Sequence, residues 1–342
     1  GWHIIELSFL NNDLFNSLLH LHSQPPLWNA LIGIFTKTVN GDLIKTSIIL
    51  NIFNYFLTIG IIIYTYKILL IFNFKEKISF IIILFLIVLN PNVIFYENIT
   101  FYTHALNFLF VNLFWLIISY FKTKKDIYEI LIYLNITIQS LIWAGIHPIL
   151  IFVVFITISI LKKSIKNKCS IYFILIFLVS LSPSIKNKII FNKFSSSTWL
   201  GINLSSTLNS MKTFHRGGVE RQCLYQIIYP DYYETYKKEY KRDINHPIAR
   251  SNSGKAYRNS VSQIILSDKC LKISIDQIKK TPIDYLKGRF LATIVSHSKF
   301  GFEYLYLSPI NFSFYDIKVF LDKNILAKRI KQIIIILYMI LF

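Results

Sequence analysis

Long apolar runs separated by short polar links dominate residues 1–183 and constrain the fold more than any other feature. Runs such as Ile78–Leu89 and Ile171–Leu181 contain no charged side chain, and 54% of the 342 residues are hydrophobic. A soluble domain of this size does not carry uncharged apolar runs on this scale. We therefore predict an all-α polytopic membrane protein.

The apolar runs predict a transmembrane bundle of six helices. The predicted spans are 45–72, 78–95, 101–121, 127–143, 149–161 and 169–181, the last of them stopped by Pro183.

The links between the spans predict how the bundle is oriented. Links 74–77, 122–125 and 162–168 are rich in lysine, whereas links 96–100 and 144–148 contain no lysine or arginine. The positive-inside rule therefore places the lysine-rich links in the cytoplasm. Orientation in the membrane and attraction to anionic lipid explain the net charge of +19 better than binding to a nucleic acid does.

The same pattern divides the chain into four regions. Residues 1–44 form an external loop with amphipathic surface helices, and 45–183 form the bundle. Residues 184–327 form a mixed, mainly helical extracytoplasmic region, and 328–342 begin a further transmembrane helix. Because the chain starts with glycine and stops inside an apolar run, we expect both ends to be cut from a longer chain.

A rigid corner lies within the first external loop. Pro25 and Pro26 restrict φ at two successive positions and exclude Gln24 from a helix. The flanking amphipathic runs, 13–20 and 28–38, are too short and too polar to span a bilayer, so we expect them to lie along its surface. A helix start marked by prolines, with two histidines nearby by chance, explains the spacing equally well.

The distinctive polar side chains of the membrane region share one predicted side, the external one. They are Asp13, His20, His22, Gln24, Glu97, Asn98, Tyr102, His104 and His147. Ionisable groups close to a membrane usually mark a pathway or a site. Any one of them could be an interfacial residue solvated by water, but their shared side favours a common external site.

A family resemblance appears at the corner. The string His22–Leu27 resembles the His-x-Pro-Pro-Leu signature in the first external loop of GT-C glycosyltransferases, with one extra residue between the histidine and the prolines. These relatives of protein O-mannosyltransferases and aminoarabinose transferases take a sugar from a polyprenyl-phosphate carrier. The resemblance covers roughly residues 10–205. It implies a GT-C bundle and an inverting transferase whose site faces the periplasm from a bacterial inner membrane.

Sugar transfer of this kind requires an acidic side chain near the acceptor and positive charge or a metal facing the leaving phosphate. The resemblance places the acidic side chains in the first external loop and in the next external link, where Asp13 and Glu97 stand, with Glu6 in reserve. Asp13 has a structural alternative as the N-cap of a helix over Leu14–Leu21.

Further candidates for substrate binding come from the whole external side. Hydroxyl, amide and indole groups in Phe194–Asn203 suit a sugar, although Trp199 also suits an interfacial anchor. Two arginines beside Gly217 and Gly218 suit a phosphate, although a solvated turn explains them as well. The candidates are His22, Gln24, Lys45, Asn98, Tyr102, His104, His147, Trp199, Asn203, Arg216 and Arg221.

The sequence says less about a cofactor and about the redox state of the cysteines. His22 and His147 could ligate a divalent metal ion, but no local spacing demands one. Cys223 and Cys270 would pair if their region faces an oxidising compartment, and two free thiols are equally consistent with the sequence.

The leading hypothesis is a membrane glycosyltransferase whose acceptor is an envelope glycolipid, a polysaccharide or a protein. A flippase or transporter of polyprenyl-linked glycans is the first alternative. It predicts polar groups at mid-depth, where the sequence has only the uncharged Asn51, Asn54, Asn107, Asn135 and Gln139. A non-catalytic scaffold, the second alternative, gives no reason for the polar residues gathered on one side.

Overall fold

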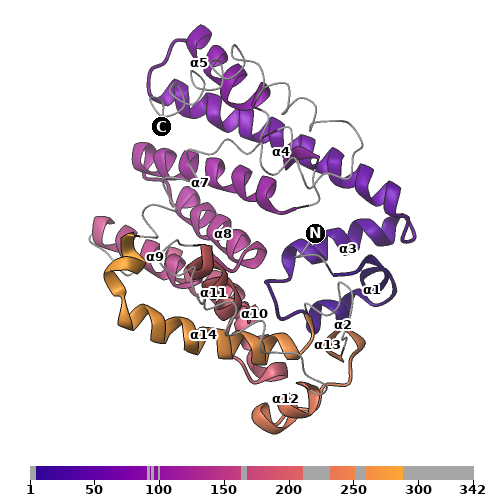
Figure 1. The fold of residues 1–342 in the computed structure, drawn as a ribbon. Helices are drawn as coiled ribbons and strands as arrows, with labels where there is room; N and C mark the ends of the chain where they lie inside the picture. Colours follow the sequence, from indigo (N-terminus) through magenta and orange to yellow (C-terminus); the bar gives the residue numbers. More distant parts are fainter. Residues whose placement is uncertain are drawn as a thin grey trace, which may run out of the picture.

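The structure, a computed structural model, describes residues 5–90, 93, 96–98, 101–162, 168–210, 232–250 and 259–287. All the elements within these ranges are helices, which confirms the all-α prediction (Figure 1). Three helices are long and apolar enough to cross a membrane: α4 (Leu43–Ile71), α7 (Thr103–Thr123) and the part of α10 (Lys168–Phe191) from Ile171 onward. They correspond to the first, third and sixth predicted spans.

The other predicted spans are shorter helices. The second is α5 (Glu76–Ile83), which continues as the π-helical turn η1 (Leu84–Val88), and the fourth and fifth are α8 (Asp126–Ile142) and α9 (Ile149–Lys162). Helix α7 packs between α4 and α8, and α8 in turn contacts α10 (Figure 1).

The surface of this bundle is apolar. Phe56, Phe80, Phe85, Ile160 and Ile171 are each 64–69% exposed. Polar side chains lie inside instead: Asn135 donates to Oδ1 of Asn112 across the α7–α8 contact at 2.8 Å, and Gln139 donates to Oδ1 of Asn135 at 2.6 Å. Apolar side chains outside and hydrogen-bonded amides between helices are what a lipid environment favours.

The prediction that Pro183 stops the sixth span is wrong, because α10 continues through Pro183 to Phe191. A proline inside a helix leaves the carbonyl four residues earlier, here that of Val179, without its backbone donor. The hydroxyl of Ser182 donates to this carbonyl oxygen at 2.7 Å. The neighbouring serine thus replaces the missing hydrogen bond, and the helix is preserved.

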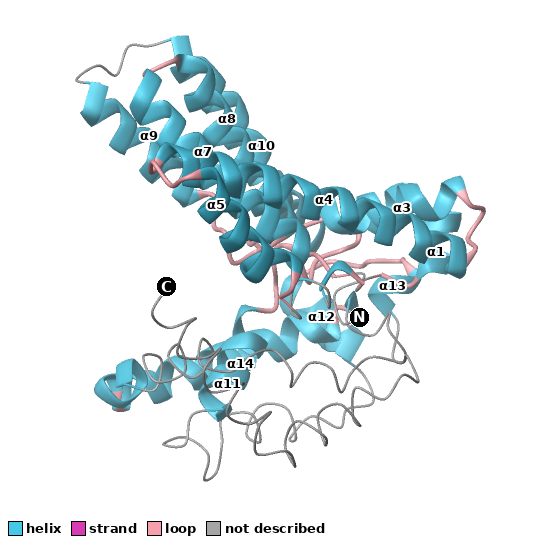
Figure 2. Ribbon diagram, turned by 90° about the horizontal axis from the view of Figure 1, so that it is seen from above, coloured by secondary structure: helices cyan, strands magenta, loops and turns pink. Residues whose placement is uncertain are grey.

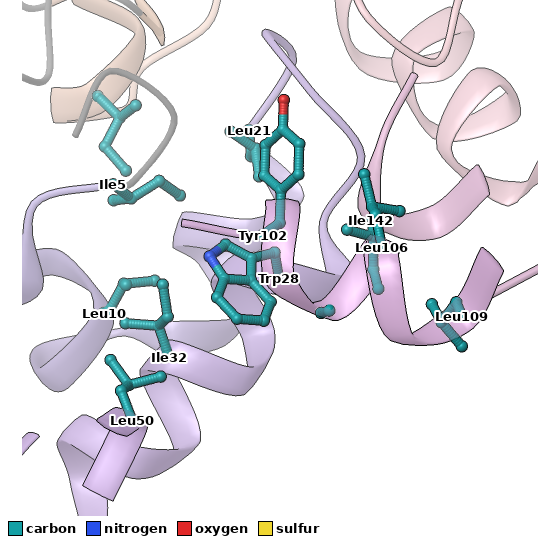
Figure 3. Close-up of a cluster of buried hydrophobic side chains, with 12 residues drawn as sticks. Ile5, Leu10, Leu21, Trp28, Ile32, Leu50, Tyr102, Leu106, Leu109 and Ile142 are labelled. Atoms are coloured by element: carbon teal, nitrogen blue, oxygen red, sulfur yellow. The ribbon is translucent and has the colours of Figure 1, made fainter. Parts of the chain in front are cut away.

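The N-terminal helices pack onto α4 and α7 through one apolar cluster. These helices are α1 (Leu7–Asn12), α2 (Leu14–Leu19) and α3 (Leu27–Thr38). Trp28 and Ile32 of α3 are 1% exposed and pack with Leu50 of α4 and Leu106 of α7 (Figure 3). The corner between α2 and α3 therefore lies close to the N-terminal end of α7.

The described residues after α10 form α11 (Leu200–Ser210), α12 (Tyr232–Tyr240), α13 (Pro247–Arg250) and α14 (Ser262–Lys280). Helices α11 and α14 lie side by side (Figure 2). Phe191, at the end of α10, packs in a second apolar cluster with Tyr236 of α12 and Ile264 of α14. Cys270 of α14 is disulfide-bonded. Cys223 lies outside the described residues.

The α11–α14 contact depends on a glycine, and this dependence can be tested. A Cβ at Gly201 would lie 1.7 Å from the backbone oxygen of Ser267, where no side chain can move aside. We expect Gly201→Ala to force the two helices apart and to lower the free energy of unfolding by about 1–3 kcal/mol.

Thermal unfolding in detergent micelles measures this effect, and Gly145→Ala is its control. The three atoms nearest to a Cβ at Gly145 all belong to the side chain of Trp143, which is 40% exposed and can rotate. Equal unfolding temperatures for the two variants would contradict the close helix contact.

Candidate functional site

His22 joins the corner to two distant segments. Its side chain is fully buried, and its Nε2 lies 2.8 Å from the backbone oxygen of Asn259 and 3.1 Å from that of Ser260. Since a carbonyl oxygen can only accept, we assign the ring proton to Nε2. Nδ1 then accepts from the hydroxyl of Thr198 at 2.7 Å.

The backbone of the corner makes further bonds to the same segments. The amide of Thr198 donates to the carbonyl oxygen of His22 at 3.0 Å, and the Ser23 hydroxyl donates to Oδ1 of Asn259 at 2.5 Å. The hydroxyl of Ser197 also donates to the carbonyl of Ser23. Both ring nitrogens of His22 are therefore engaged within the protein, which leaves neither for a phosphate or a metal ion in this arrangement. Burial first, and the charge of Lys186 second, lower the pKa of His22 to about 3.

Gln24 of the corner has a side-chain amide that can still form hydrogen bonds. It is 6% exposed, and neither its amide oxygen nor its amide nitrogen has a hydrogen-bond partner within the described structure. A buried amide without partners costs free energy, so each such group needs an explanation. A ligand or a water molecule at this position would supply one.

Glu97 lies in a second polar group, at the contact between α4 and α7. The hydroxyl of Thr58 donates to Oε1 of Glu97 at 3.1 Å, and it lies 2.9 Å from Nε2 of His104. The side-chain amide of Asn54 donates to the backbone oxygen of Glu97 at 3.0 Å. His104 is 1% exposed, whereas Glu97 is half-buried. The half-buried carboxylate of Glu97 is therefore connected to a buried hydrogen-bonded group.

Asp13 has the structural role that its sequence position also allowed. It is exposed and caps α2, accepting from the backbone amide of Asn16 at 3.2 Å and from the side-chain amide of Asn16 at 2.7 Å. These bonds lower the pKa of the Asp13 carboxyl. The nearby His20 stacks on His246, with ring centroids 4.1 Å apart.

Three further candidates have mainly local contacts. His147 is exposed, and its Nδ1 accepts from the amide of Ile149 at 3.2 Å, next to the start of α9. Lys45 is exposed and pairs with Asp42 at 3.7 Å. Tyr102 is buried and stacks on Phe101, with ring centroids 4.3 Å apart.

The last group of candidates lies in the link before α7 and in the region after α10. Trp199 is buried beside the corner, whereas Asn98 and Asn203 are exposed. Arg216 and Arg221 lie outside the described residues.

Two of the predicted site residues, Glu97 and His104, both contact Thr58. His22 bonds to Thr198, the residue that precedes Trp199. The hydrogen bonds described for Asp13, His22 and Glu97 do not join these three residues in one site. Within the described ranges, no group of three or more histidine, cysteine or acidic side chains could hold a metal ion.

No family model, curated protein or solved structure matches this chain. The assignment of a function therefore rests on the chemistry of the site and on the resemblance at the corner.

Two residues of these polar groups were not predicted from the sequence. Thr58 contacts both Glu97 and His104, and its spacing of four from Asn54 on an apolar span is the signal that marks it. Asn259 binds both His22 and Ser23 from a position more than 230 residues away, and no local pattern indicates it.

Proposed function

We propose that the chain is a membrane glycosyltransferase of the GT-C type, which moves a sugar from a polyprenyl-phosphate donor to an envelope acceptor on the external face. The all-α fold and the three helices able to cross a membrane are consistent with this class. The disulfide at Cys270 supports an oxidising compartment for the region after α10. The observation that carries the proposal is the position of Glu97.

Glu97 has the features that a catalytic base needs. Its carboxylate is half-buried and receives a hydrogen bond from Thr58, so its orientation is defined while part of its surface stays open to a substrate. Asp13, by comparison, is exposed and engaged in capping α2. We therefore assign the base to Glu97.

The proposed reaction is a single displacement at the anomeric carbon. Glu97 accepts the proton of the acceptor hydroxyl, and the oxygen of that hydroxyl forms the new glycosidic bond with the anomeric carbon. The bond between the anomeric carbon and the phosphate oxygen breaks, and polyprenyl phosphate leaves with the electron pair, so the configuration inverts. Gln24 is the candidate for hydrogen bonding to the donor, because its buried amide has no partner in the described structure.

Replacement of Glu97 by glutamine tests this proposal. The change keeps the size of the side chain and removes its basicity, so we expect donor turnover to fall by about 10²–10⁴-fold. The assay uses the protein in liposomes with a panel of radiolabelled polyprenyl-phosphate sugars and a total envelope extract as acceptor. It follows the release of polyprenyl phosphate, a product that does not depend on which acceptor is used.

Two matched variants accompany this test. Glu76→Gln alters an exposed glutamate at the start of α5, and Asp13→Asn alters the capping carboxylate. We expect both to retain turnover within a few-fold of the unmodified protein. Full activity in Glu97→Gln would overturn the residue assignment, and a protein that turns over no donor of the panel would overturn the function.

The transporter alternative has no comparable observation in its favour. Asn135 and Gln139 are two of the mid-depth amides on which it depends. Gln139 donates to Asn135, and Asn135 donates to Asn112 across the α7–α8 contact. A packing role explains these bonds without a transport pathway.

A further inference from the structure

We infer that Thr58 and His104 are positioning residues that hold the Glu97 carboxylate in its working orientation. The inference rests on the proposed function for its kinetic consequence, but the chain of hydrogen bonds rests on the contacts in the structure. It joins three elements: α4 supplies Thr58, α7 supplies His104, and the link before α7 supplies Glu97.

The direction of the chain follows from the tautomer of His104. Its Nδ1 is buried without a hydrogen-bond partner in the described structure, while its Nε2 lies 2.9 Å from Oγ1 of Thr58. A proton on Nδ1 would leave a buried N–H unbonded, and a strong donor without an acceptor is rarer in proteins than an acceptor without a donor. We therefore place the proton on Nε2, where both Oγ1 of Thr58 and the backbone oxygen of Asn54 can accept it.

This tautomer determines what the Thr58 hydroxyl does. With its oxygen accepting from His104, its single proton is directed to an acceptor, and Oε1 of Glu97 lies 3.1 Å away. The competing acceptor, the backbone oxygen of Asn54, is farther away at 3.3 Å and uncharged. Because a hydrogen bond to an ionised acceptor is the stronger one, the hydroxyl donates to Glu97.

The chain therefore fixes one carboxylate oxygen of Glu97 and leaves the other to face the acceptor hydroxyl. The side-chain amide of Asn54 holds the backbone of the same residue at 3.0 Å, which restrains Glu97 from a second direction. Both restraints come from α4, one turn apart, so the orientation of the base depends on how α4 packs against α7.

Thr58→Val tests the inference, because valine keeps the branched shape and removes the hydroxyl. We expect kcat for donor turnover to fall by about ten- to hundredfold, the effect of losing a hydrogen bond to a charged group, with KM for the donor nearly unchanged. Thr58→Ser restores the hydroxyl and should recover most of the rate.

Thr46→Val is the matched control on the same helix. Thr46 is also buried, but its hydroxyl donates only to the backbone oxygen of Asp42, at 2.7 Å, among the contacts described. A general disturbance of α4 would lower kcat in Thr46→Val as much as in Thr58→Val, and that result would overturn the inference.

A second measurement does not require activity. The rate at which a carboxyl-reactive carbodiimide labels Glu97, followed by mass spectrometry, reports how firmly the side chain is held. We expect faster labelling in Thr58→Val and an unchanged rate in Thr58→Ser and Thr46→Val. Unchanged labelling in Thr58→Val would overturn the inference whether or not the protein transfers sugar. Faster labelling in a protein that turns over no donor would uphold the contact and overturn only the proposed function.

Discussion

We expect replacement of His22 by leucine to lower the free energy of unfolding by about 3–5 kcal/mol. The change leaves the hydroxyl of Thr198 and the carbonyl oxygens of Asn259 and Ser260 without their partner in a fully buried position. Each such group costs about 1–3 kcal/mol. Chemical unfolding in detergent micelles, followed by tryptophan fluorescence, measures the loss.

His147→Leu is the control for this experiment. His147 is exposed and makes one described bond, to the amide of Ile149, so we expect its loss to cost about 1 kcal/mol at most. If both histidine variants unfold at the same denaturant concentration, His22 does not join the corner to the later segments.

The response to acid gives a second measure of the same contact. Burial lowers the pKa of His22 from 6.5 to about 3, so the folded protein keeps the ring neutral where the unfolded chain protonates it. The unfolded state then binds the extra proton, and stability falls as pH drops below 6.5, by about 1.4 kcal/mol per unit. Between pH 7.5 and pH 5 the unmodified protein should therefore lose about 2 kcal/mol more than His22→Leu does.

The second large effect is expected at the other end of the bundle. Glu129 of α8 has a side chain only 3% exposed, which bonds to Lys162 of α9 and accepts from the hydroxyl of Tyr133 at 2.7 Å. Lys162→Met leaves this carboxylate buried without its cation. We expect a loss of about 3–5 kcal/mol in the free energy of unfolding, measured as for His22.

Two variants separate the buried pair from charge effects at the surface. Asp126 also binds Lys162, at 2.8 Å, but its side chain is 54% exposed, so Asp126→Asn should cost about 1 kcal/mol or less. Addition of Glu129→Gln to Lys162→Met removes the uncompensated charge and should recover part of the stability. A double variant less stable than Lys162→Met would show that the buried carboxylate was not the cause.

The helices of the bundle were largely predictable. The predicted spans 45–72 and 101–121 differ by two residues or fewer at each end from α4 and α7. An apolar run and the polar residues that end it are local properties, and the hydrogen bonds of a helix are local as well. The error at Pro183 arose because the rescue of its missing bond depends on a side chain, that of Ser182, whose rotamer the sequence does not reveal.

The candidate site was predictable only in part. Sequence position alone allowed two roles for Asp13, and the structure shows the cap. For Glu97 and His104, the sequence predicted a shared external side but not a contact. Their connection runs through Thr58, which belongs to a helix some forty residues earlier in the chain.

The amino-acid sequence by itself determined which segments are helical and which of them are apolar enough for lipid, because both properties depend on neighbours a few residues apart. Only the tertiary structure decided which polar side chains meet. His22 bonds with Thr198 and Asn259, and Glu97 with Thr58, across sequence separations of 39 to 237 residues. Such pairs form where helix packing buries polar groups, and each group must then find a partner among the side chains and backbone that the packing brings near.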